Sequence, residues 1–195
     1  MMKTIYAATA ITLATSAFGA NPAPATHRYL VERTFPAGAL DGVDAAAKQK
    51  VNANNKTLDV TWEKSYANAA KTKTYCIYDA PNEQAVRDAA KLNGLPVDVV
   101  KEIPSDIKAE PRGAVQKIAA GKQRYLVKRT GQPRVDGTSD SKFGVMLLTS
   151  YGSADQHDTY WVYEAPSYSA VEAAAKAGHA PFESIAEIPV TLYPN

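Results

Sequence analysis

The sequence predicts an α+β protein made of two similar units in tandem. Two internal matches carry this prediction. Residues 28–34 (RYLVERT) and 124–130 (RYLVKRT) share six of seven residues at an offset of 96. Residues 74–106 align without gaps on residues 159–191 at an offset of 85, with 14 identities in 33 positions. Self-similarity of this kind indicates that one structural unit occurs twice.

Alternating and helical hydrophobic patterns predict the elements of the first unit, residues 27–106. In chain order they are a strand at 28–34, a helix from Asp41 to about Asn54, strands at 60–66 and 74–78, a helix between Asn82 and Gly94, and a strand at 99–103. The order β-α-β-β-α-β is that of the ferredoxin-like sandwich, in which two helices cover one face of a four-stranded antiparallel sheet.

The second unit, residues 124–195, is predicted to lack its first helix. The two offsets differ by 11 residues, which is about three helical turns, and residues 131–145 are rich in Gly, Pro, Asp and Ser. Between the units, residues 107–123 are predicted to form a linker helix that starts near Pro111 and ends at Gly121. We expect this helix to lie where the missing one would have been.

Residues 1–20 are predicted to be a signal peptide. A short basic start precedes the apolar stretch 5–14, and small residues follow it. The stretch is too short for a membrane span of about 20 residues. The sequence therefore predicts an exported protein, periplasmic or secreted, without membrane insertion.

Charge and motif content exclude several classes of function. With 22 basic and 20 acidic side chains the formal net charge is +2, which provides no electrostatic basis for binding nucleic acid. The single cysteine, Cys76, cannot form an internal disulfide, and the three histidines are scattered. The motifs of α/β hydrolases, phosphate loops and zinc proteases are absent from the sequence.

The segments YLVERTF, SYANAAKTKTYCIYDAP and NGLPVDVVKEIP resemble a small ferredoxin-like family of unknown function that includes an actinobacterial nickel-responsive, nickel-binding protein. The resemblance covers residues 28–103 well and 124–188 partly. Members of that family are single domains that pair sheet against sheet. The resemblance therefore implies a monomer in which the two units form an intrachain pseudo-dimer.

The resemblance also implies a metal site, but it carries over at one position only, His179. Glu183 and Glu187 follow at i+4 and i+8, and such a set suits nickel or another divalent cation. The alternative is that His179 ends a helix and that both glutamates are solvated.

Polar residues that occur in both units are candidate binding residues. Arg33 corresponds to Arg129 and Tyr78 corresponds to Tyr163. The alternative is that the tyrosines fill the core between the units. Cys76 aligns with Trp161, which predicts a buried position of large apolar volume.

Three functions follow as expectations. The leading one is an exported, non-enzymatic module that binds a small ligand or a divalent metal such as nickel. The second is an enzyme of the dimeric α+β barrel type, oxygenase-like or isomerase-like, with a pocket between sheet and helices. The third is a structural or protein-interaction domain.

Overall fold

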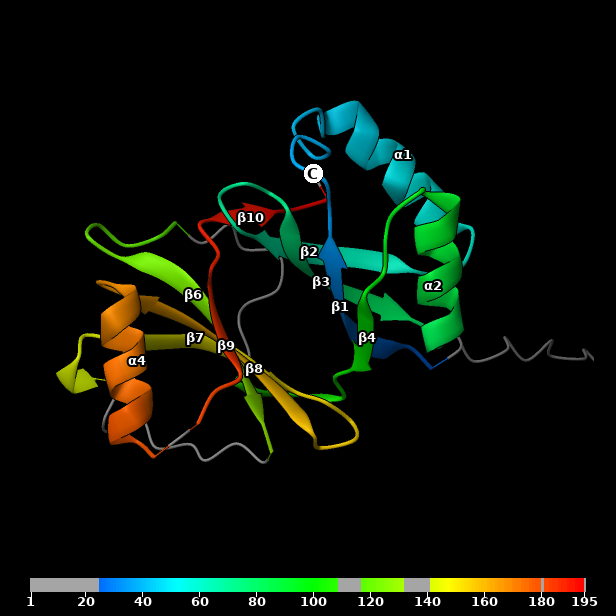
Figure 1. Ribbon diagram of the computed structural model, residues 1–195. Helices are drawn as coiled ribbons and strands as arrows, with labels where there is room; N and C mark the ends of the chain where they lie inside the picture. Colours follow the sequence, from blue (N-terminus) through cyan, green and yellow to red (C-terminus); the bar gives the residue numbers. More distant parts are fainter. Residues whose placement is uncertain (1–24, 109–116, 132–140, 180, 195) are drawn as a thin grey trace, which may run out of the picture.

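The computed structural model describes residues 25–108, 117–131, 141–179 and 181–194 (Figure 1). These residues form two five-stranded antiparallel sheets and three helices, which confirms the predicted α+β class. The helices are α1 (Ala45–Lys56), α2 (Glu83–Leu92) and α4 (Tyr168–Ala177). The predicted signal peptide lies outside the described residues.

The first sheet has the strand order β10-β2-β3-β1-β4. Its strands are β1 (His27–Thr34), β2 (Thr61–Ala67), β3 (Lys73–Ala80), β4 (Val99–Glu102) and β10 (Val190–Leu192). The second sheet has the order β5-β7-β8-β6-β9. Its strands are β5 (Ser105–Lys108), β6 (Gln123–Thr130), β7 (Met146–Gly152), β8 (Asp158–Ala165) and β9 (Ser184–Glu187).

The two halves of the chain exchange one edge strand each. β5 follows β4 in the sequence but pairs with β7 in the second sheet, where Ser105 lies opposite Gly152. β10 ends the chain and pairs with β2 in the first sheet, where Val190 lies opposite Ala67. Each sheet is therefore completed by a strand from the other half.

The described residues of the predicted linker, 107–108 and 117–123, are not helical. Residues 105–108 form β5, residues 117–119 have no regular structure, and residues 109–116 lie outside the described part. The Ala119 backbone N–H donates to Glu164 Oε2 over 3.4 Å, so this stretch lies beside β8. Ser141 and Lys142 are helical next to the undescribed residues 132–140, so the loss of a first helix from the second unit stays a prediction.

Side-chain caps define where the helices begin. Asp44 accepts a hydrogen bond from the Ala47 backbone N–H over 2.8 Å, and Asn82 accepts one from Ala85 over 2.9 Å. Both satisfy an N–H group that has no partner within its helix. The cap of α1 is thus Asp44 rather than the predicted Asp41, whose backbone N–H donates to Gly38 in the preceding turn.

The molecule has four layers, with α1 and α2 on the outside of the first sheet, α4 on the outside of the second, and the sheets facing each other between them (Figure 1). Because neighbouring residues of a strand point to opposite faces, Leu30 enters the core between the sheets while Tyr29 and Val31 enter the core under the helices. Three hydrophobic clusters result, one between the sheets and one on each outer face.

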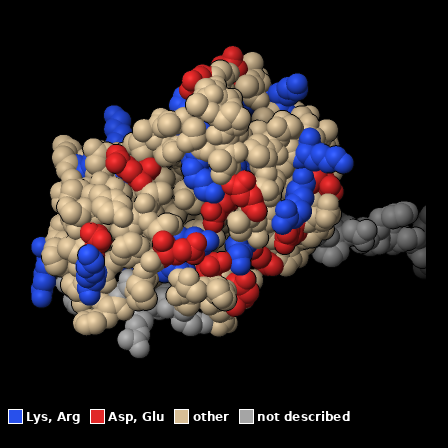
Figure 2. Space-filling view, in the orientation of Figure 1, with Lys and Arg blue, Asp and Glu red and all other residues tan. Residues whose placement is uncertain are grey.

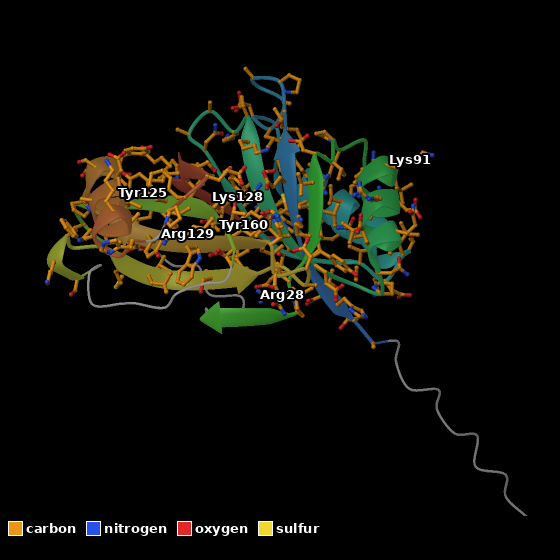
Figure 3. The ribbon with its side chains drawn as sticks, turned by 60° about the horizontal axis from the view of Figure 1, so that its bottom comes forward. Arg28, Lys91, Tyr125, Lys128, Arg129 and Tyr160 are labelled. Carbon is orange, nitrogen blue, oxygen red and sulfur yellow. The ribbon has the colours of Figure 1, made fainter. Side chains whose placement is uncertain are left out.

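A polar network joins the sheets at the edge of their shared core. The buried Glu32 carboxylate accepts from the Tyr160 hydroxyl over 3.1 Å and pairs with Lys73 Nζ at 3.3 Å and Lys128 Nζ at 3.7 Å. Figure 3 shows Lys128 and Tyr160 near the boundary with the first sheet. One carboxylate thus links residues from both halves of the chain.

Basic and acidic side chains are interspersed over the face seen in Figure 2, in line with the balanced composition of the sequence. Within the described part of the chain, no helix has the length and apolar character needed to cross a membrane.

Candidate functional site

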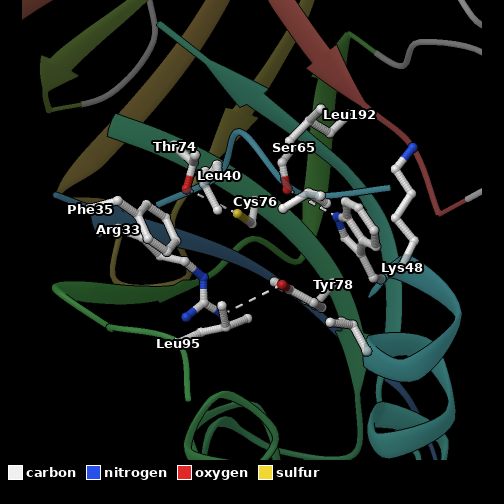
Figure 4. Close-up of a pocket in the computed structure, with 13 residues that line it drawn as sticks. Arg33, Phe35, Leu40, Lys48, Ser65, Thr74, Cys76, Tyr78, Leu95 and Leu192 are labelled. Atoms are coloured by element: carbon white, nitrogen blue, oxygen red, sulfur yellow. Dashed lines mark hydrogen bonds between the residues drawn. The ribbon is translucent and has the colours of Figure 1, made fainter. Parts of the chain in front are cut away.

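A cavity of about 80 Å³ lies on the outer face of the first sheet, beside α1 (Figure 4). It is half-open to solvent and its walls are mostly apolar. Its lining comes from β1, β2, β3, α1, the loops at 35–43 and 95, and the exchanged strand β10: Arg33, Phe35, Leu40, Val43, Lys48, Val51, Trp62, Ser65, Thr74, Cys76, Tyr78, Leu95 and Leu192.

Arg33 and Tyr78, both predicted as binding residues, meet in this cavity. Arg33 Nη2 donates to the Tyr78 hydroxyl over 3.5 Å, and the guanidinium carbon lies 5.7 Å from the centre of the Tyr78 ring. Arg33 lies opposite Thr74 on β3. Tyr78 lies four residues further along β3, so both side chains leave the same face of the sheet.

Burial determines the charge states of this pair. Burial raises the pKa of Tyr78, and the nearby Cys76 raises it further, whereas Arg33 lowers it. For Arg33, burial lowers the pKa, but contacts with Tyr78 and Cys76 outweigh that effect and raise it. The cavity therefore holds a guanidinium cation beside a protonated hydroxyl, which can still donate to a ligand.

The second sheet repeats this pair with a larger side chain beside it. Arg129 Nη2 donates to the Tyr163 hydroxyl over 3.3 Å. Trp161 stacks on Tyr163 with ring centres 6.2 Å apart, and the Arg129 guanidinium lies 5.4 Å from the Trp161 ring. Trp161 therefore stands on the second sheet at the position that Cys76 holds on the first.

A tryptophan is present on each outer face, but on a different strand. In the first sheet it is Trp62 on β2, whose indole N–H donates to Ser65 Oγ over 3.0 Å. Strand register places Trp62 opposite Tyr78 and Leu147 opposite Tyr163. The first outer face thus has Trp62 and Cys76 where the second has Leu147 and Trp161. Cys76 is buried, as predicted, and forms part of the cavity wall.

The predicted metal residues are not brought together. His179 is exposed and ends α4 with a left-handed backbone (φ 49°), the conformation that Gly94 adopts after α2. The Glu183 side chain is 52% exposed and pairs with Lys128 Nζ at 3.2 Å, while Glu187 is exposed on β9. In the described ranges, no three His, Cys, Asp or Glu side chains are arranged to hold a metal ion.

Much of the cavity wall was not predicted from the sequence. Ser65 and Thr74 could have been identified as candidates, because they recur at the offset of 85 as Ser150 and Thr159. Leu192 could not have been identified, because its place in the wall depends on the exchange of β10.

Comparison with known proteins supports the family resemblance for the first half of the chain. Residues 29–103 match the family described as "Nickel responsive protein SCO4226-like". This segment contains α1, α2 and strands β2 and β3, with most of β1 and β4. No curated protein sequence matches the chain.

Among solved structures, the chain is similar to a "putative monooxygenase" from Lactobacillus acidophilus NCFM, with 10% identity, 88% of this chain and 98% of that chain covered, and a TM-score of 0.42. It is also similar to a mutant chlorite dismutase from Candidatus Nitrospira defluvii, with 8% identity, 87% and 91% covered, and a TM-score of 0.43.

These names correct the leading functional prediction. The structures of similar fold are described as enzymes, and none of those compared above is described as a binding module. The expectation of a non-enzymatic binding module is therefore wrong, and the alternative of an α+β barrel-type enzyme agrees better with the comparison.

Proposed function

We propose that this protein is an α+β barrel-type enzyme that acts on a small molecule in the cavity beside α1, by isomerase-like or oxygenase-like chemistry. One observation carries the proposal: a buried cation and a protonated hydroxyl, Arg33 and Tyr78, meet in a cavity whose other walls are mostly apolar. Concave apolar sites with a few convergent polar groups are the usual form of small-molecule sites.

The pair is suited to stabilising negative charge that develops on a substrate oxygen. Isomerisation through an enol and oxygenation of an enol or phenol both pass through such an oxyanion. A fixed hydroxyl donor beside a cation stabilises it more strongly in a buried site than in water. Tyr78 is the donor in this scheme and Arg33 supplies the charge.

The cavity favours a small substrate. Its volume of about 80 Å³ compares with about 10 to 15 Å³ of the same measure for one enclosed water molecule. The cavity therefore has room for a molecule of several non-hydrogen atoms.

Deuterium exchange tests this proposal. The purified protein is incubated in D2O with butanone or 2-oxobutyrate, and loss of the hydrogens next to the carbonyl group is followed by NMR. We expect accelerated exchange with at least one of them: a base from the solvent takes the α-hydrogen as a proton, Tyr78 donates to the enolate oxygen that forms, and D2O returns a deuteron to the carbon. Tyr78→Phe should slow the protein-dependent rate about 100- to 1,000-fold, the usual effect of removing one oxyanion donor.

Two further variants serve as controls. Tyr163→Phe makes the same change on the second sheet, where Trp161 stands at the position of Cys76, and it should leave the exchange rate unchanged. The double variant Trp62→Leu/Cys76→Trp copies the second outer face and should abolish exchange by filling the cavity. Equal rates in the wild type and this double variant would refute the proposal.

We further propose that the two halves are tandem copies of one unit, packed as an intrachain pseudo-dimer. Their internal sequence matches and their matching strand orders support this. A single monomeric species in sedimentation velocity is the expected result, and a stable dimer would contradict it.

We also propose export through the N-terminal segment. The basic start and apolar stretch of residues 1–20 support this proposal. N-terminal sequencing of the protein from its source cells should show cleavage near residue 20, and an intact N-terminus would contradict it.

A further inference from the structure

We propose that the substrate is a small carboxylate with an apolar body, and that Arg33 binds its carboxylate group. This inference rests on the proposed function, because it names the substrate class of the same cavity. It goes further because it assigns a negative charge to the ligand, places its carboxylate at Arg33 and places its hydrocarbon body against the apolar wall.

The first argument is that Arg33 is a buried cation without a carboxylate partner in its cavity. Arg33 is 2% exposed, and none of the cavity's lining residues is Asp or Glu. The positive charge of Arg33 helps to lower the pKa of Asp98. The direct contacts of the Asp98 carboxylate, however, are with Thr34 Oγ1 at 2.6 Å and Lys73 Nζ at 3.1 Å. A buried charge is costly unless it is paired, so an anionic ligand would complete the site.

Two other arginines show the usual arrangement, an ion pair with a carboxylate. Arg28 binds Glu63 with a shortest contact of 2.7 Å, and the fully buried Arg124 binds Glu164 at 2.9 Å. Arg33 differs from both because its partners are the Pro96 carbonyl, the Tyr78 hydroxyl and the Cys76 thiol, none of which is a carboxylate.

The second argument is the free edge of the guanidinium. Arg33 Nε is buried and has no hydrogen-bond partner among the described residues. Its neighbour Nη2 reaches the Tyr78 hydroxyl at 3.5 Å, the long limit for a hydrogen bond. Nε and Nη2 lie on one edge of the guanidinium, and such an edge binds both oxygens of a carboxylate.

The third argument is the apolar character of the remaining wall. Phe35, Trp62, Leu95 and Leu192 line the cavity, and contact with them favours a hydrocarbon body over a hydrated anion. The volume of about 80 Å³ selects a short one. Short-chain carboxylates satisfy all three conditions.

Isothermal titration calorimetry with sodium butyrate and with butyramide tests the inference. The two molecules have nearly the same shape and differ in charge. At constant ionic strength, we expect butyrate to bind about 10- to 100-fold more tightly, the difference that hydrogen bonds to a charged group provide. This comparison uses the unaltered protein and does not depend on a variant that folds.

Variants then locate the binding site. Arg33→Met should abolish the preference for butyrate, whereas Arg87→Met, which removes an exposed arginine of α2, should leave it intact. Trp62→Leu/Cys76→Trp should abolish binding of both molecules.

Two results would overturn the inference. Equal affinity for butyrate and butyramide would refute the carboxylate assignment but leave an uncharged ligand possible, and the deuterium exchange of butanone would then decide whether the proposed enzyme stands. A preference for butyrate that survives Arg33→Met would show that the anion binds elsewhere.

Discussion

The hydroxyl groups of Tyr66 and Tyr151 lie 3.4 Å apart at the contact between the two sheets. Tyr66 is on β2 and Tyr151 is on β7, and the two are separated by the repeat offset of 85. Burial raises the pKa of Tyr151, while Lys64 and Tyr66 lower it. Two positions that the internal sequence match aligns therefore contact each other, as equivalent residues do at a two-fold interface.

This contact predicts coupled stability effects. Tyr66→Phe and Tyr151→Phe should each lower the free energy of unfolding by about 1 kcal/mol, the usual net contribution of one hydrogen bond. In the double variant the free energy of unfolding should fall by less than the sum of the two single losses. The difference should be at least about 0.5 kcal/mol, because the shared hydrogen bond is removed only once. Urea unfolding of the four proteins measures this cycle, with the exposed Tyr168→Phe as control. Strictly additive losses would contradict the prediction.

Tyr75 and Tyr160 predict a loss of stability at high pH. Burial and the negative charge of Glu32 raise the pKa of Tyr75 to about 12 and also raise that of Tyr160. Because the unfolded value is 10.0, the folded protein holds these protons more tightly. Their stabilisation is fully present below pH 10 and is lost as the pH rises toward 12 and beyond.

The measurement is urea unfolding between pH 8 and pH 12. Above pH 10, each raised tyrosine should contribute a decline of about 1.4 kcal/mol per pH unit. In Tyr75→Phe, the decline in the free energy of unfolding should be smaller by about 1.4 kcal/mol per pH unit, because one of these tyrosines is absent. An identical slope in the variant would refute the assignment, because lysine titration is common to both proteins.

Arg124 and Glu164 form the most buried ion pair of the second sheet, with side chains 2% and 4% exposed. Glu164→Leu leaves the guanidinium without its carboxylate and should lower the free energy of unfolding by about 3 to 5 kcal/mol. Glu83→Leu removes the carboxylate of the exposed ion pair with Arg87 and should change the free energy of unfolding by about 1 kcal/mol or less. Chemical denaturation compares the two, and similar losses would contradict the prediction.

The two outer faces predict an exchange of residues that the fold should tolerate. Cys76→Trp alone places an indole beside Trp62 and should cost about 1 to 3 kcal/mol by overpacking. Trp62→Leu/Cys76→Trp restores the volume found around Leu147 and Trp161 and should stay within about 1.5 kcal/mol of the wild type. Thermal unfolding tests this order, and a double variant less stable than the single one would overturn it.

Local sequence pattern predicted a helix well where the sequence contains both a single capping residue and an apolar face at helical spacing. Asn82 begins α2 as expected, and Val86, Ala89 and Ala90 are its buried face. Asp41 was a wrong cap for α1 because Asp41 and Asp44 both precede the helix, and only the turn at Gly38 decides between them.

The candidate site was predicted in part for the same reason. Arg33 and Tyr78 leave the same face of the sheet because of strand alternation and register, both of which follow from local sequence. His179 was assigned by resemblance alone. It is exposed at the end of α4, and the described residues around it form no group that could hold a metal ion.

The sequence by itself determined the internal matches, most strands and helices, and the polar residues Arg33 and Tyr78 on one face of a sheet, because side-chain periodicity acts over a few residues. Only the tertiary structure decided that β5 and β10 change sheets and that Leu192 and Cys76 line one cavity. Strand pairing and free volume depend on residues far apart in the chain, and these meet only when the sheets pack.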